Sequence, residues 1–157
     1  MALHTYIDTI PHRQQRYPTV GDYWRPAVQR TGLVERTEIR VSELGNEDYE
    51  FLISIHEQIE EYLTRKRGIS EKVITAFDIA YETARQEGDD SEPGDAPDAP
   101  YRAEHQFATS IEKQLAIELG VNWFEYNEAI NNLFEPAFSS CTTSSTGKAD
   151  EGNSSTE

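Results

Sequence analysis

The central stretch of the sequence reads EDYEFLISIHEQIEEYLTRKR from Glu47 to Arg67. Its apolar residues recur every three or four positions, which is the spacing of one face of an α-helix. They are Leu52, Ile55, Ile59 and Leu63. Acidic residues begin the stretch and basic residues end it, as the helix dipole favours, and Gly68 follows as a natural C-cap. We therefore predict a helix over residues 47–67, and the rest of the chain is interpreted around it.

Three further helices are predicted downstream. Ser70 can cap a helix that runs to about Arg85, and another helix spans residues 101–119 and stops at Gly120. A fourth opens on Asn122-Trp123-Phe124-Glu125, a capping-box pattern, and runs to about Phe134. The residues expected to face inward are Val73, Ile74, Phe77, Tyr81 and Ala84 on the second helix, and Phe107, Ala108, Ile111, Leu115 and Leu119 on the third.

A strand is predicted before the first helix. Residues Thr37 to Val41 alternate polar and apolar, as a half-buried strand does, so Ile39 and Val41 should face inward. Residues 1–20 contain two prolines and are interpreted as an extended arm. The predicted fold class is α+β: a mainly helical single domain of about four helices, with a small N-terminal antiparallel β-hairpin or sheet.

The length of 157 residues suits one compact domain, which we place at residues 21–137. Residues 86–100 form an acidic loop with six carboxylates, three prolines and no positive charge. We interpret this loop as a solvated linker, with a lid over a site as the alternative. Residues 138–157 are polar and are predicted to be a disordered tail. About half of the excess negative charge falls in these two segments.

The net charge of −15 argues against a nucleic-acid partner, because phosphate binding needs a basic face. It favours metal cations and basic proteins instead. No apolar run approaches the length of a membrane span, and the N-terminus does not resemble a signal peptide. The lone Cys141 cannot form an internal disulfide, so we expect a cytoplasmic location. The oligomeric state is not indicated.

The first helix carries a pattern of metal-ligand type. His56 and Glu60 are four residues apart, so they lie one turn apart on the apolar face and are aimed into the core together. Burial of an ionised Glu is costly unless a partner compensates it, and a divalent cation is one such partner. Glu57 lies at the flank of this face, where it could act as a general base on metal-bound water. The alternative is a hydrogen-bonded structural histidine beside a solvated helix edge.

A metal site needs further ligands, because zinc takes three protein ligands and a water in catalytic sites. Asp78 is one candidate, since it follows Ile74 by four residues on the inward side of its helix. His105 is the other, with Glu112 two turns further along the same edge, able to orient it or to bind. Zinc is the preferred metal, and iron and manganese also accept mixed imidazole and carboxylate ligands.

The segment from Phe51 to Glu60 resembles the active-site helix of the zincin-like metallohydrolases. The similarity covers about residues 36–66 and includes the strand-like Thr37 to Val41 and the apolar residues leading to His56 and Glu57. In the family motif HExxH, both histidines bind zinc and the glutamate is the general base. Glu60 stands here in place of the second histidine. The resemblance implies metal-dependent hydrolysis of peptides.

A broader similarity links the chain to small phage-encoded proteins of uncharacterised function. It rests on Val20-Gly21-Asp22, Glu92-Pro93-Gly94-Asp95, Ala99-Pro100-Tyr101 and Gly120-Val121-Asn122-Trp123. It implies a phage or prophage origin, and hence the cytoplasm of a host cell, without implying an activity.

Three functions are therefore left open. The first is a metal-dependent hydrolase, peptidase-like, whose anionic cleft would favour a cationic or neutral substrate. The second is an acidic phage protein that binds and inhibits a host factor. The third is an enzyme like the all-α nucleotide pyrophosphohydrolases, suggested by the paired carboxylates Glu57 and Glu60 on one helix and Asp78 and Glu82 on the next, with magnesium as its metal.

Overall fold

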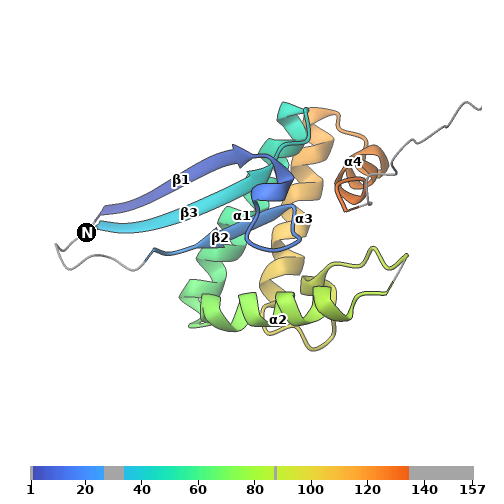
Figure 1. Cartoon of the computed structure of the whole chain (residues 1–157). Coiled ribbons are helices and arrows are strands. Elements are labelled where there is room, and N and C mark those ends of the chain that lie inside the picture. The colour runs from blue at the N-terminus through green and yellow to red at the C-terminus, as the bar shows by residue number, and fades with distance from the viewer. Residues whose placement is uncertain (1, 27–33, 87, 135–157) are drawn as a thin grey trace, which may run out of the picture.

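The computed structural model describes residues 2–26, 34–86 and 88–134, so the predicted tail and Cys141 lie outside the described residues. A small sheet comes first and four helices follow (Figure 1). The strands are β1 (Ala2–Ile10), β2 (Gly21–Trp24) and β3 (Val34–Ser42), and the helices are α1 (Glu47–Lys66), α2 (Glu71–Ala84), α3 (Arg102–Leu119) and α4 (Trp123–Asn131). Two short 3-10 helices, η1 (His12–Gln14) and η2 (Pro93–Asp95), complete the list. The predicted α+β, mainly helical, single-domain class is confirmed.

The sheet is mixed, with strand order β1-β3-β2. β2 runs antiparallel to β3, as predicted, but β1 pairs with β3 in parallel along its whole length, from Ala2 opposite Val34 to Ile10 opposite Ser42. The prediction of an extended arm over residues 1–20 is therefore wrong for residues 2–10. Parallel strands are joined by a long connection and not by a tight turn. No local turn signal after β1 could therefore indicate that β1 pairs with β3.

Polar caps set the ends of the helices close to the predicted positions. The side chains of Asn46, Ser70 and Asn122 accept hydrogen bonds from backbone amides at the starts of α1, α2 and α4. Gly120 ends α3 in the left-handed conformation, with φ of 69°, which costs glycine little. α4 ends at Asn131, three residues before its predicted end.

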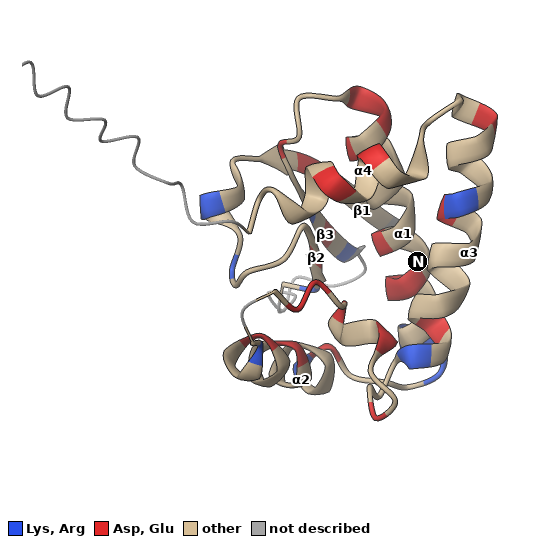
Figure 2. Ribbon diagram, turned by 90° about the vertical axis from the view of Figure 1, so that its right-hand side faces the viewer, with Lys and Arg blue, Asp and Glu red and all other residues tan. Residues whose placement is uncertain are grey.

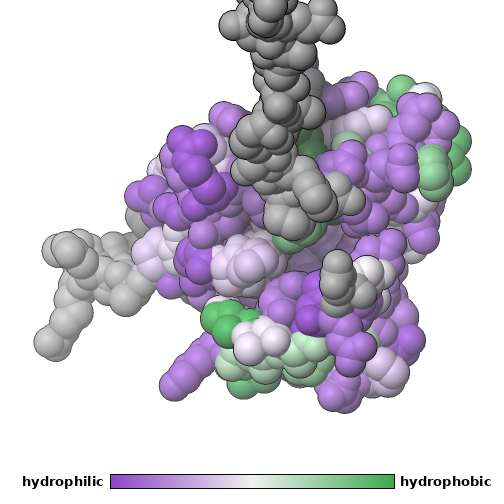
Figure 3. Space-filling model, turned by 45° about the vertical axis from the view of Figure 1, so that its right-hand side comes forward, coloured by the Kyte–Doolittle hydropathy of each residue, from purple (hydrophilic) through white to green (hydrophobic). Residues whose placement is uncertain are grey.

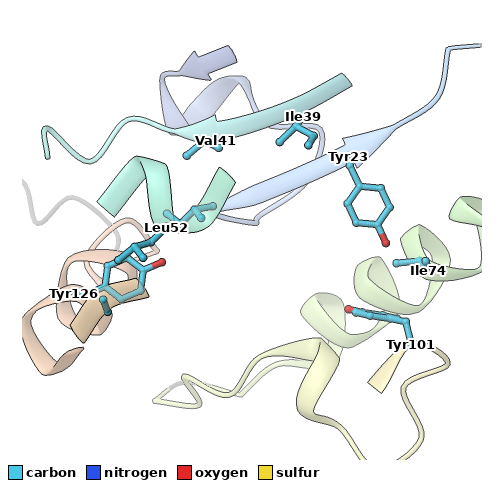
Figure 4. Packing of buried hydrophobic residues seen from close by; sticks show 9 residues of the cluster. Tyr23, Ile39, Val41, Leu52, Ile74, Tyr101 and Tyr126 are labelled. Carbon is cyan, nitrogen blue, oxygen red and sulfur yellow. The ribbon is translucent and has the colours of Figure 1, made fainter. Parts of the chain in front are cut away.

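The helices pack on one face of the sheet, where α1 and α3 run side by side and α2 crosses them (Figure 1). Ile39 and Val41 of β3 are buried, as predicted, and point toward Leu52 of α1 (Figure 4). Tyr126 of α4 packs beside Leu52 at the same end of the core. At the other end, Tyr23, Ile74 and Tyr101 point toward one another from β2, α2 and the start of α3 (Figure 4).

The predicted inward faces are partly wrong. Ile55, Ile59 and Leu63 of α1 are only half-buried, because they line a shallow hollow beneath the sheet with Thr5 of β1. On α2 and α3, Val73 and Phe107 are about half exposed, at 50% and 51%. The buried positions of α1 and α3 are instead largely polar: Ser54, His56, Glu60, Glu61 and Thr64 on α1, and Glu104, His105 and Glu112 on α3. The two helices thus face each other through polar side chains, which a search for apolar stripes does not find.

The acidic segment over residues 86–100 is more ordered than a free linker. Its 3-10 helix η2 packs against α2 and α3, and Gly94 within it is buried. At η2, the acidic segment is therefore packed as part of the compact domain.

The core makes a direct prediction about stability. Leu52 is fully buried, whereas its neighbour Phe51 is 44% exposed. Leu52→Ala should lower the free energy of unfolding by about 2–5 kcal/mol, because it leaves a cavity between α1 and β3. Phe51→Ala is the matched control and should cost less than about 1 kcal/mol. Urea denaturation followed by circular dichroism measures both, and equal losses would contradict the described packing of α1.

Candidate metal centre

α1 and α3 bring His56, Glu60 and His105 together in the interior. His105 Nδ1 lies 3.0 Å from Glu60 Oε2, His56 Nε2 lies 3.2 Å from His105 Nδ1, and His56 Nε2 lies 3.3 Å from Glu60 Oε2. All three side chains are buried, and each residue is less than a tenth exposed. Two of the ligands come from one turn of α1 and the third comes from the first turns of α3. This buried group can hold a metal ion.

The size of this triangle fits a metal ion. Ligands placed tetrahedrally around zinc at about 2.0–2.1 Å are about 3.3 Å apart, and octahedral neighbours at a similar distance are about 3.0 Å apart. The three measured edges, 3.0, 3.2 and 3.3 Å, fall in this range. His56, Glu60 and His105 therefore lie at separations that would suit one face of a metal coordination shell.

A carboxylate stands behind each imidazole. His56 Nδ1 lies 2.9 Å from Glu112 Oε2, and Glu112 also accepts a short hydrogen bond from the Tyr126 hydroxyl. His105 Nε2 lies 3.0 Å from Glu92 Oε2, close enough for an ion pair but without a hydrogen bond. Metal-binding histidines commonly present their second nitrogen to a carboxylate in this way, which fixes the ring and its tautomer.

The carboxylates of Glu112 and Glu92 influence which nitrogen of each imidazole carries the proton. A carboxylate only accepts hydrogen bonds, so Glu112 holds the proton of neutral His56 on Nδ1 and leaves the Nε2 lone pair directed at the triangle. Glu92 favours the opposite tautomer of His105, with the lone pair on Nδ1. The structure corrects one expectation here, because Glu112 lies against His56 and not against His105.

The charges of the centre strongly perturb its titration. Burial favours neutral imidazoles, but hydrogen bonds and charge interactions with the carboxylates outweigh it. They raise the pKa of His105 to about 10 and that of His56 well above its usual value. Burial also favours the neutral acid at Glu60, yet hydrogen bonds from both histidines lower the pKa of Glu60 to about 2. The two histidines therefore stabilise the ionised form of Glu60 inside the protein.

Glu57 lines the same cavity as the three ligands. Burial, followed by the negative charge of Glu60, raises the pKa of Glu57 well above its usual value. Its carboxylate lies against Gly21 of β2, where a Cβ atom would collide with it. Gly21 therefore leaves the space that Glu57 occupies.

A second glycine makes the same kind of contact on the other side of the centre. A Cβ atom at Gly94 would collide with the ring of His105. The 3-10 helix η2 can approach α3 this closely because residue 94 has no side chain. Glu92, two residues earlier, reaches the far nitrogen of the same ring.

Asp78 lies elsewhere in the cavity and is not part of the three-residue group. It accepts hydrogen bonds from the hydroxyls of Tyr101, at 2.6 Å, and Tyr17, at 3.2 Å. Of the four residues suggested as metal ligands, the structure thus brings together His56, Glu60 and His105 and separates Asp78 from them.

The centre opens into a cavity of about 780 Å³.

The sequence did not assign a role in the site to Glu92, Gly21 or Gly94. Glu92 is one of six carboxylates in an acidic run, so nothing in the sequence distinguishes it. The Pro93-Gly94 pair does signal a turn, but a turn signal does not show which ring the turn will contact.

No protein family, curated protein or solved structure was found to match this chain. Within the described ranges, no helix is both long and apolar enough to cross a lipid bilayer. The functional interpretation therefore rests on the geometry of the centre.

The glycine contacts generate a prediction about metal affinity. Gly94→Ala should push the His105 ring away from Glu60 and weaken the binding of an added metal ion about 10–100-fold, as changes behind a metal ligand typically do. Gly21→Ala is the control, because it displaces Glu57 and leaves the three ligands in place. Competition with a chromogenic zinc chelator measures both affinities. Equal zinc affinities of Gly94→Ala and the unaltered protein would show that η2 does not position His105.

Proposed function

We propose that this protein is a zinc-dependent hydrolase with His56, Glu60 and His105 as the metal ligands and Glu57 as the general base. The observation that carries the proposal is the convergence of three ligand atoms within 3.3 Å, with a further carboxylate beside each imidazole. Donors of this type, two histidines and a glutamate, are those of several catalytic zinc sites.

The charge balance supports a divalent cation at this position. Glu57, Glu60, Glu92 and Glu112 surround the two imidazoles. Without a metal, protons on both rings offset part of this negative charge, but those protons compete for one acceptor, Glu60 Oε2. A divalent cation replaces the two protons with one ion of the same total charge, +2, at the centre of the triangle.

The donor set also disfavours magnesium. Magnesium prefers oxygen ligands and retains its waters, so a centre with two imidazoles suits it poorly. This disfavours the pyrophosphohydrolase alternative, and Glu82, one of the carboxylates suggested for it, is bound to Arg85 at 2.6 and 2.7 Å. Iron(II) accepts two histidines and a carboxylate, and metal analysis distinguishes it from zinc.

In the proposed reaction, a bound zinc ion would lower the pKa of a coordinated water. Glu57, which lines the same cavity as the three ligands, would take the proton of that water. Glu112 would hold His56 in the ligand tautomer through a hydrogen bond, and the charge of Glu92 would favour a proton on the far nitrogen of His105. Tyr23 donates a hydrogen bond to Glu60 Oε1 at 3.2 Å, which leaves Oε2 for the metal.

Peptides are the proposed substrates. The zincin-like sequence of α1 supports this class, and a cavity of about 780 Å³ is large enough for several atoms on each side of a scissile amide. Gly21 and Tyr23 of β2 are among the residues that line the cavity.

The first test of this function is the metal content. Protein purified without chelators should contain a zinc ion in each chain by mass spectrometry, and His105→Ala and Glu60→Ala should lose it. Asp95→Asn, which changes an exposed carboxylate outside the centre, serves as the control and should keep its zinc. Protein that holds no metal, and whose melting temperature does not respond to zinc, iron or manganese, would favour the acidic binding protein instead.

The second test separates metal binding from catalysis. Glu57→Gln should keep its zinc and lose about 10²–10⁴-fold in the rate of peptide cleavage, because the variant cannot accept the proton. Gly21→Ala should show a smaller loss of the same kind. Cleavage of a quenched fluorescent peptide library measures these rates. An unchanged rate in Glu57→Gln would exclude Glu57 as the base.

A further inference from the structure

Asp78 is a buried carboxylate without a buried positive partner. It is only 6% exposed, and its two oxygens accept hydrogen bonds from the neutral hydroxyls of Tyr101 and Tyr17. No ion pair to Asp78 is found in residues 2–26, 34–86 and 88–134. Burial of a carboxylate away from positive charge is costly, and here burial raises the pKa of Asp78 to about 6.

The basic residues near this part of the molecule are engaged elsewhere. Arg16 binds Asp22 through two hydrogen bonds, at 2.6 and 2.8 Å. Arg85, which lines the cavity, binds Glu82. Charge repulsion adds to the imbalance at Asp78, because the neighbouring charges that act on it are the carboxylates of Glu60 and Asp22. A positive charge that reached Asp78 would therefore have to come with a ligand.

We propose that Asp78, with Tyr17 and Tyr101, forms a subsite of the cavity that binds a cationic side chain of the substrate, guanidinium or ammonium. The inference rests on the proposed function for its substrate class, which it narrows to peptides that carry Arg or Lys near the scissile bond. It does not use Asp78 as a metal ligand.

The aromatic rings of Tyr17 and Tyr101 line the cavity beside Asp78. Phe77 supports Tyr101 from outside the cavity through an edge contact, with ring centroids 6.5 Å apart. A guanidinium binds carboxylates in a planar, forked geometry and also stacks on aromatic faces, so a carboxylate beside tyrosines suits it. The Asp78 oxygens retain lone pairs for such a ligand, because each oxygen accepts one hydrogen bond from a tyrosine hydroxyl.

The subsite lies close to the candidate metal centre along α3. Tyr101 precedes the first turn of α3, and the backbone amide of His105 donates to the Tyr101 carbonyl at 3.0 Å. The two side chains also contact each other, with ring centroids 6.2 Å apart. Asp78 and the metal ligands line one continuous cavity. A substrate whose cation binds Asp78 can therefore extend its backbone to the metal centre.

The cavity as a whole has the same charge preference. Eleven Asp and Glu residues line it, and Arg85 is the only Lys or Arg among the described residues that do. Figure 2 shows acidic residues on each of the helices around this region, and the face shown in Figure 3 is mostly hydrophilic. This environment attracts cations in general, and Asp78 supplies the specific contact within it.

The test compares two probes of nearly equal shape. N-acetyl-arginine amide carries a guanidinium, and N-acetyl-citrulline amide carries a neutral urea in its place. Isothermal titration calorimetry at pH 7.5, on both metal-free and zinc-treated protein, should show about tenfold tighter binding of the arginine probe. Asp78→Asn should abolish this preference, whereas Asp98→Asn, an exposed carboxylate outside the cavity, should keep it.

Equal binding of the two probes to the unaltered protein, no detectable binding of the arginine probe, or a preference that survives in Asp78→Asn would each overturn the subsite. The comparison on the unaltered protein does not depend on how the variant folds. Failure of the proposed function has a different signature, since a protein that holds no zinc can still prefer arginine through Asp78. Zinc binding without that preference would leave the metal centre in place and remove the subsite.

Discussion

The structure depends on the accommodation of buried charge between α1 and α3. Among residues 2–26, 34–86 and 88–134, thirteen polar or charged residues are buried, against ten hydrophobic ones, an unusual balance for the interior of a small domain. Ionised groups are stable in such a place only if each finds a partner. Here His56 and His105 lie between carboxylates on both sides, so the imidazoles and carboxylates satisfy one another across the interface. The packing of α1 on α3 and the charge balance of the centre are therefore one constraint.

The remaining elements are arranged around this constraint. β2 supplies Tyr23, which donates to Glu60, and Gly21, which leaves space for Glu57. α4 supplies Tyr126, which donates to Glu112, and η2 brings Gly94 against His105. The hydrophobic core lies mainly at the two ends of this polar interior, around Leu52 and around Ile74 (Figure 4). Apolar burial thus holds the elements in place, and the polar contacts determine how they are oriented.

The sequence predicted the helices well because caps are local signals. Asn122 and Gly120 mark helix ends whatever the rest of the chain does. The sequence predicted the inward faces less well, because Ile55 and Ile59 form an apolar stripe that faces the sheet while a polar stripe faces α3. The pair His56 and Glu60 could be recognised by spacing alone. Two features could not be predicted, the pairing of β1 with β3 and the contact of Glu92 with His105. Each joins segments far apart in the sequence, and no local sequence pattern indicates that they meet.

The pairing of His56 with a carboxylate, Glu60, on α1 has a structural consequence. With two histidines on one helix, two neutral ligands would be present before any tertiary packing. Here α1 offers one imidazole and one carboxylate, and the second imidazole comes from α3, 45 residues after Glu60. The three ligand atoms meet only when α3 has docked on α1, and η2 has then to pack over His105 through Gly94. A metal ion bound to this set would therefore stabilise the packing of two helices and a loop, since binding to the folded state alone adds its free energy to folding.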